Sequence, residues 1–340
     1  MSATSGYRPA LDGVRALAIA GVMTQHLHLS HAPGGALGVD VFFVLSGYLI
    51  TGLLATERAT TGSIDLPAFY VRRVARLYPA LLALVVVGGI IAVTDLNVPT
   101  RTVVISGVLA ATYVTDIATY THTSAWAFWG FTWSLAIEEH FYLLWPGSLR
   151  LMRRVDPRKV AVAAGLVALV VGEVFARGGG VGPSPSYFQP QTHAFGLFAG
   201  CALALSAPPR WTRHLTLPCL AAIIALMVAG PSATDVNYLR VGVPVTALLT
   251  VGMLAGLEHE PPISGLLGWA PIRRIGVISY GLYLYHQLIF NLLDYHLHAR
   301  RWVEIVVNVV VAIAVAEISF RFYESPIRSR GRRYRRTPRL

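Results

Sequence analysis

An arginine and a histidine stand eleven residues apart in the apolar stretch RALAIAGVMTQH, residues 15–26. If this stretch is α-helical, eleven steps of about 100° bring Arg15 and His26 to within about 20° of the same face. The rise between them is about 16 Å, roughly half the hydrocarbon thickness of a membrane. Ionisable groups at membrane depth usually act on a substrate or pair with each other, so the stretch predicts a functional polar face.

A carboxylate is the expected partner of this histidine. Asp40 follows the short loop SHAPGGALG, and it lies at nearly the depth of His26 if the two flanking segments are antiparallel neighbours. A carboxylate on one imidazole nitrogen fixes the tautomer and raises the basicity of the other nitrogen, as a general base requires. We therefore predict that Asp40 orients His26. The alternative is that both are structural residues of the outer membrane interface.

No metal site is expected beside them. The histidines of HLHLSH have spacings that suit a tetrahedral metal site poorly, and no thiolate or carboxylate pattern supports one.

Three arginines, Arg72, Arg73 and Arg76, precede the third apolar segment in FYVRRVARLYP. Arg73 and Arg76 are three residues apart on a helical turn, so their guanidinium groups can converge on one anion. They could clamp the phosphates of a nucleotide-bearing donor, or they could be ordinary positive charge on the cytoplasmic side. The residues alone leave both interpretations open.

Two aromatic stretches carry further polar groups. In FTWSLAIEEHFYLLWP, Glu138 and Glu139 point about 100° apart on a helix, so they form no acid–base pair on one face. We expect one glutamate to face a cavity and the other to pair with an arginine. In SYGLYLYHQLIF, His286 lies near the middle of its segment with Tyr285 beside it. We expect these two to pack or to position substrate, with a second catalytic histidine as the alternative.

The composition of the chain places these residues in a membrane. Its 340 residues are 54% hydrophobic and 13% charged, against about a quarter charged in soluble domains. Much of the net charge of +11 lies in short basic clusters beside apolar segments. Such clusters indicate topology and contact with lipid headgroups, so we expect the lipid bilayer as a partner and no nucleic acid. The prediction is an all-α, polytopic helical bundle in the cytoplasmic membrane.

Charge placement then predicts the topology. The apolar segments lie at roughly 13–30, 36–55, 78–95, 101–118, 130–149, 159–176, 190–206, 215–230, 240–257, 275–293 and 302–322. The later basic loops remain cytoplasmic only if one segment, 101–118, does not cross; the arginine pair 300–301 then stays outside. We therefore predict about ten transmembrane helices, both termini in the cytoplasm, and a re-entrant segment near 96–129 that lines a cavity. The membrane domain is expected over 1–326 and a basic cytoplasmic tail over 327–340.

Together these stretches resemble acyltransferase family 3, the integral-membrane acyltransferases that modify glycans, lipids and polyketide products. The resemblance is collinear over almost the whole chain and is carried by LDGVRALAIAGVMTQH, GVDVFFVLSGYLI, FYVRRVARLYPALL, WSLAIEEHFYLLWP, GLFAGCALAL, ISYGLYLYHQLIF and RFYESPIR. His140 is a departure, because family members often have Gln after the two glutamates.

The resemblance implies a membrane O-acyltransferase that moves a short acyl group from cytoplasmic acyl-CoA, with acetyl-CoA the expected donor. His26 would be the catalytic histidine and Arg15 its companion, while Arg73 and Arg76 would handle the CoA phosphates. The resemblance also ranks Glu138 above Glu139. The acceptor would be a hydroxyl of a sugar, a glycolipid or a macrolide-like natural product. Many members carry a fused hydrolase-like domain that finishes the transfer, whereas this sequence ends soon after RFYESPIR. We therefore expect this chain to act alone or with a separate periplasmic or membrane partner.

Two mechanisms and two other functions remain as alternatives. His26 could deprotonate the acceptor hydroxyl, or it could first accept the acyl group itself. A proton-coupled multi-pass transporter would also use intramembrane histidine and glutamate, and a non-catalytic scaffold is a further possibility.

Overall fold

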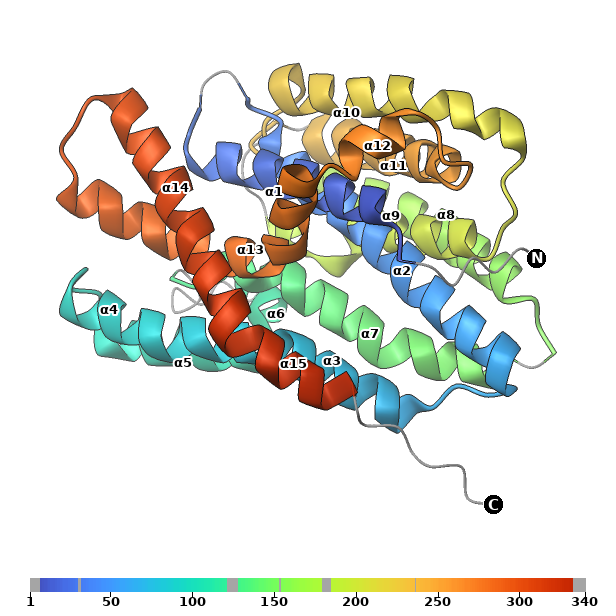
Figure 1. Ribbon diagram of the computed structural model, residues 1–340, viewed down its shortest axis with the longest axis horizontal. Helices are drawn as coiled ribbons and strands as arrows, with labels where there is room; N and C mark the ends of the chain where they lie inside the picture. The colour runs from blue at the N-terminus through green and yellow to red at the C-terminus, as the bar shows by residue number, and fades with distance from the viewer. Residues whose placement is uncertain are drawn as a thin grey trace. The chain divides into compact units, whose positions relative to one another are not determined.

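The computed structural model describes residues 7–332 except 30–31, 121–127, 153, 179–184 and 236. Its regular structure is helical throughout the described residues, which confirms the predicted all-α class (Figure 1). The helices are α1 Pro9–His26, α2 Gly38–Thr61, α3 Leu66–Ala83, α4 Gly89–Thr94, α5 Thr100–Ala111, α6 Thr115–Tyr120, α7 Trp133–Leu151, α8 Pro157–Gly178, α9 Pro190–Ala204, α10 Thr216–Ala229, α11 Val243–Leu257, α12 Ile263–Leu267, α13 Ala270–His296, α14 Arg301–Ser319 and α15 Ser325–Arg332.

Several of these helices can cross a membrane. In the described residues, six helical runs are long and apolar enough: Gly35–Thr61, Leu66–Thr94, Pro157–Arg177, Arg210–Ala229, Tyr238–Leu257 and Arg301–Gly331. They support a multi-pass membrane protein. The count of ten crossings and the cytoplasmic position of both termini stay predictions.

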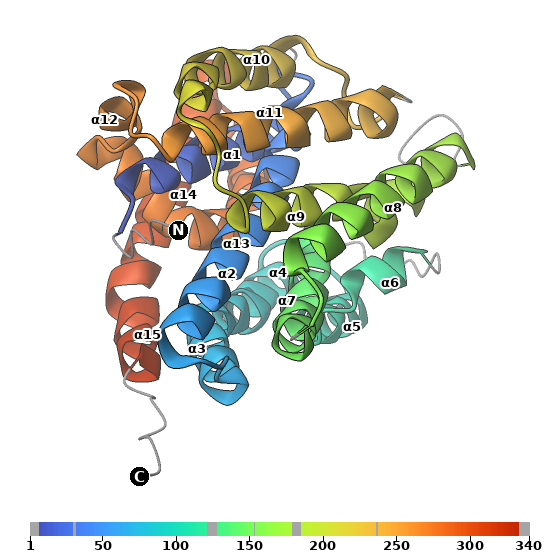
Figure 2. The same cartoon turned by 90° about the vertical axis from the view of Figure 1, so that its right-hand side faces the viewer.

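Contacts within the chain group the helices into two compact units. The first unit comprises residues 1–64 and 137–277, and the second comprises residues 65–136 and 278–340. The first unit therefore holds α1, α2 and α8 to α12, and the second holds α3 to α6, α14 and α15. In the first unit, α10 and α11 lie side by side, as Figures 1 and 2 both show.

Helices α2 and α9 approach each other backbone to backbone in the first unit. A methyl group added to Gly47 would lie 1.9 Å from the Leu197 carbonyl oxygen, and one on Gly200 would lie 2.2 Å from that of Val44. Small residues allow such close helix packing in membranes, where burial of apolar surface drives association weakly. These two glycines therefore set the spacing between α2 and α9.

We expect Gly47→Ala to destabilise the protein by about 1–3 kcal/mol, because the added methyl group must push two helix backbones apart. The measurement is thermal unfolding of the purified protein. Gly52→Ala is the matched control on the same helix, since a methyl group there meets nothing within 4 Å. Equal loss of stability in the two variants would contradict the packing argument.

The predicted re-entrant region lies in the second unit and contains two short helices. Helix α5 has 12 residues, a length of about 18 Å, which is too short for a hydrocarbon core of about 30 Å. Helix α6 follows with six residues, and residues 121–127 lie outside the described part. The structure therefore agrees with a segment that does not cross, while its lining of a cavity stays a prediction.

The first part of the predicted basic tail is a helix. Residues 325–332 form α15, which packs on α3 so closely that a methyl group on Gly331 would lie 2.4 Å from the Ala75 side chain. Residues 333–340 lie outside the described part. The boundary predicted at residue 327 therefore falls inside a packed helix, and the division into two domains stays a prediction.

Candidate active site

Helix α1 carries the two residues from which the site is built. It runs unbroken from Pro9 to His26, with a proline at its first position, where the missing amide hydrogen costs nothing. Arg15 and His26 are therefore on one continuous helix, and the helical geometry that places them on one face holds.

His26 ends α1 in a defined ring orientation. Its Nδ1 lies 3.1 Å from the Val22 carbonyl oxygen, and because a carbonyl only accepts, Nδ1–H is the donor. A neutral ring then carries its lone pair on Nε2, as a general base needs. The segment η1, Gly35–Leu37, packs closely against the last turn of α1. A methyl group added to Gly35 would lie 3.1 Å from the Gln25 amide nitrogen.

Asp40 has other partners than the one predicted. Its Oδ1 lies 2.8 Å from Nδ1 of His193, and its Oδ2 accepts a hydrogen bond from the Tyr238 hydroxyl at 3.4 Å. The prediction that Asp40 orients His26 by direct contact was therefore wrong. The reason is the helix face: Asp40 and Gly47 are seven residues apart, so the carboxylate shares the side of α2 that packs on α9.

His193 and Asp40 form a buried, hydrogen-bonded pair. The side chain of His193 is 0% exposed and that of Asp40 is 2% exposed. The second ring nitrogen of His193, Nε2, lies 2.8 Å from the Tyr187 carbonyl oxygen. The Tyr187 carbonyl only accepts, so Nε2 of His193 carries a hydrogen. Both ring nitrogens of His193 thus have partners, and the residue holds α2, α9 and the Tyr187 segment together.

Arg15 has a carboxylate partner one helical turn away. Its Nη1 lies 3.2 Å from Oδ1 of Asp12, which is buried, and the Tyr7 hydroxyl donates to the other carboxylate oxygen at 2.5 Å. Partial burial, and then this hydrogen bond, raise the pKa of Tyr7. Sequence analysis gave Asp12 no role, although its spacing of three from Arg15 is that of a helical ion pair.

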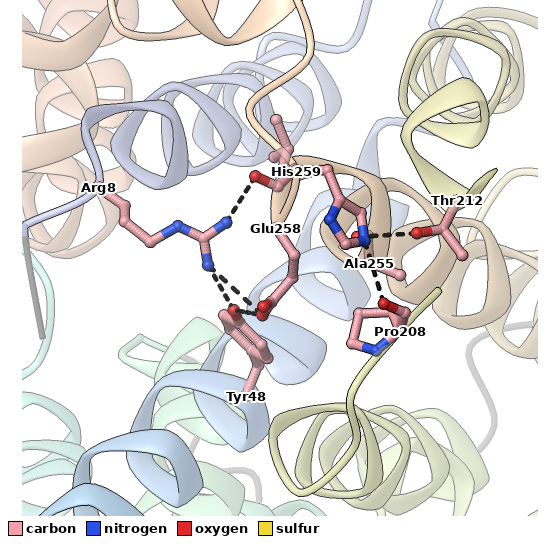
Figure 3. A network of polar contacts seen from close by, with 8 residues as sticks. Arg8, Tyr48, Pro208, Thr212, Ala255, Glu258 and His259 are labelled. Atoms are coloured by element: carbon pink, nitrogen blue, oxygen red, sulfur yellow. Dashed lines mark hydrogen bonds and ion pairs between the residues drawn. The ribbon is translucent and has the colours of Figure 1, made fainter. Parts of the chain in front are cut away.

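A second polar network fixes the start of α1 (Figure 3). Nη1 of Arg8 donates to the Tyr48 hydroxyl at 2.7 Å, and its Nη2 donates to the Leu257 carbonyl at 2.7 Å. The Tyr48 hydroxyl in turn donates to Glu258. Close by, His259 bonds the Pro208 carbonyl at 3.1 Å. The network joins α1 to the middle of α2 and the end of α11, so it fixes the turn before Asp12 and Arg15.

One of the two adjacent glutamates of α7 has a hydrogen-bond partner on α2. The Ser46 hydroxyl of α2 donates to Glu138 Oε1 at 2.6 Å, and both glutamates are half-buried. The structure thus brings Glu138 to α2 through a serine. The roles of Glu138 and Glu139 stay predictions.

In the second unit, Arg72, Arg73 and Arg76 lie on α3 and are all half-buried. They are on one helix, as the spacing predicted, and α15 packs on the same helix. Their proposed contact with CoA phosphates stays a prediction.

Tyr285 and His286 are held inside the second unit. The Tyr285 hydroxyl lies 2.9 Å from the Ser319 hydroxyl and 3.3 Å from the Ala80 carbonyl oxygen. His286 is fully buried, its Nδ1 donates to the Leu282 carbonyl at 2.9 Å, and its ring lies 5.5 Å from that of Phe290. This setting agrees with packing. Positioning of substrate by either residue stays a prediction.

The chain matches known proteins over nearly its whole length. The family model described as an acyltransferase domain matches residues 8–320. The chain is 35% identical to the peptidoglycan O-acetyltransferase OatA of Listeria monocytogenes, over 96% of this chain and 56% of that protein. It is 32% identical to the O-acetyltransferase OatA of Staphylococcus aureus, over 96% of this chain and 58% of that protein. The chain thus spans little more than half the length of these relatives. No solved structure matches it.

Proposed function

The chain belongs to this acyltransferase family, and from that premise we propose that it transfers an acetyl group from cytoplasmic acetyl-CoA to a hydroxyl of a cell-wall glycan. The observation that carries the proposal is the alignment of 96% of the chain with O-acetyltransferases, one of them named for peptidoglycan. Peptidoglycan is therefore the first acceptor to test, ahead of a glycolipid or a macrolide-like product. The comparisons lend no support to the transporter alternative.

His26 is the proposed base. Its Nε2 lone pair takes the proton of the acceptor hydroxyl, whose oxygen attacks the thioester carbonyl. The carbon–sulfur bond breaks, CoA leaves as the thiolate, and the imidazolium returns the proton to sulfur. In the two-step alternative, Nε2 attacks the thioester carbonyl, the carbon–sulfur bond breaks and CoA leaves as the thiolate; the acceptor hydroxyl then attacks the acetylimidazolium, its proton passes to the thiolate, and neutral His26 is regenerated.

The other polar groups support this reaction in the proposal. Arg15, held by Asp12, lies about 16 Å along α1 from His26, and it would stabilise negative charge on the donor as it reaches up the helix. Arg73 and Arg76, with Arg72 beside them, would hold the CoA phosphates. A separate periplasmic or membrane partner that completes delivery to the final acceptor is a further part of the proposal.

The test is acetyl transfer by the full chain, purified in detergent and returned to a bilayer. We expect release of CoA thiol from acetyl-CoA that rises when soluble peptidoglycan fragments are added, with mass spectrometry showing one added acetyl group. A glycolipid and a macrolide are the comparison acceptors. If no acyl-CoA yields thiol with any acceptor, and the protein binds no CoA, the proposal is wrong.

A further inference from the structure

A cavity of about 430 Å³ opens among four helix ends of the first unit. It lies between the last turns of α2, the end of α7, the start of α8 and the end of α9. Nine of its ten lining residues are apolar, among them Leu54, Leu149, Met152 and Leu205, and the tenth is Arg58. Its size is that of a small-molecule site, but its lining suits an apolar chain beside one negative charge.

Arg58 is fixed at the wall of this cavity. Its Nη1 donates to the carbonyl oxygens of Leu149, in the last turn of α7, at 3.1 Å and of Met152, directly after that helix, at 3.0 Å. These bonds hold the guanidinium group at a helix C-terminus. Its Nε and Nη2 bond to none of the described residues, so two donors remain on a positioned charge. A phosphate oxygen is the ligand that such donors recognise well.

The cavity is at the level where lipid headgroups would lie. One candidate crossing, Gly35–Thr61, ends beside it and another, Pro157–Arg177, begins beside it. Beyond the cavity, α8 turns Leu166 and Val170 outward with 57% and 64% of their side chains exposed, as a lipid-facing helix does.

The surface around the mouth is basic. The described residues from the end of α7 to the start of α8 include four exposed cations and one acidic residue, Asp156; the cations are Arg150, Arg154, Arg158 and Lys159. Clusters of this kind beside a membrane-spanning helix attract anionic lipid. An anionic group is therefore drawn to the mouth, and the apolar walls favour an amphiphile over a free phosphate.

We propose that this cavity binds an anionic phospholipid, with its phosphate on Arg58 and the upper part of one acyl chain against Leu54, Leu149 and Leu205. The lipid joins the ends of α2, α7, α8 and α9. This site is separate from the proposed acetyl transfer and does not depend on it.

The experiment titrates the full chain, purified in a neutral detergent, with dioctanoyl phosphatidylglycerol and counts bound lipid by native mass spectrometry. We expect Arg58→Gln to weaken binding about tenfold, the effect of losing one charged hydrogen-bonding group. We expect Ala59→Trp to abolish it, because the ring fills the cavity while Ala59 itself is exposed and tolerates a larger side chain. This second variant tests the site even if Arg58→Gln fails to fold.

Three controls complete the design. Arg177→Gln removes an exposed arginine at the far end of α8, away from the cavity, and should change affinity less than twofold, since one surface charge contributes little. Dioctanoyl phosphatidylcholine should bind about tenfold more weakly than the anionic lipid, and glycerol phosphate alone should not bind detectably. Equal binding of the two lipids, unchanged binding in both cavity variants, or glycerol phosphate binding as tightly as the lipid would each overturn the proposal.

Discussion

Replacing His26 with alanine should lower the turnover number for acetyl transfer about a thousandfold and leave the fold intact. A positioned base or nucleophile contributes roughly 10²–10⁴-fold, and no other residue of the described α1 offers an imidazole. His26 is half-buried at the end of its helix, so the variant should unfold within about 2 °C of the wild-type protein. The measurements are initial rates with acetyl-CoA and peptidoglycan fragments, and thermal unfolding.

The matched control is His28→Asn. His28 lies two residues further on, is exposed, and has a φ of 50°, a backbone conformation that asparagine tolerates. This variant should keep at least about half of the activity, as surface substitutions usually do. Full activity in His26→Ala, or equal losses in the two variants, would remove His26 from the chemistry.

The same variant separates the two mechanisms. If Nε2 takes the acetyl group, wild-type protein incubated with labelled acetyl-CoA and no acceptor should retain label that His26→Ala lacks. If Nε2 is only a base, neither protein retains label, and the thousandfold loss in rate remains.

Sequence analysis predicted the features that depend on local pattern. The helical continuity of α1, and the grouping of Arg72, Arg73 and Arg76 on one helix, follow from periodicity, and the structure has both. The short α5 followed from charge placement, because a crossing there would have inverted every later basic loop but one. These features depend on residues that lie close together in the sequence.

Asp40 shows what local pattern leaves out. Its depth was judged from the loop that joins two neighbouring segments, but its direction depends on α9, about 150 residues further along the chain. The available signal was a pair of matching spacings: Asp40 precedes Gly47 by seven residues, and His193 precedes Gly200 by seven. Two close-packed helices with an ionisable residue two turns before each glycine bring those residues together, as the Gly47 and Gly200 contacts show.

Because Asp40 bonds to His193 and not to His26, we expect its substitution to lower the stability of the protein first. Removing one member of this buried carboxyl–imidazole pair should be costly, because the other member is left without its hydrogen-bond partner in a medium of low dielectric constant. We expect Asp40→Asn and His193→Gln each to destabilise the protein by about 3–5 kcal/mol. The segment η1 lies directly before α2 and packs against the last turn of α1, which ends at His26. Each of the two substitutions should therefore also reduce turnover.

The double variant Asp40→Asn with His193→Gln removes both ionisable groups and keeps two amides that can bond each other, so it should recover most of the lost stability. Thermal unfolding of the four proteins gives the coupling between the two residues, and acetyl-transfer rates give its effect on His26. Recovery of both stability and turnover is the result expected if Asp40 acts by anchoring η1. If the double variant is no more stable than the less stable single variant, the two residues are not a pair. If Asp40→Asn instead abolishes turnover at unchanged stability, Asp40 acts on the reaction itself, and its contact with His193 is secondary.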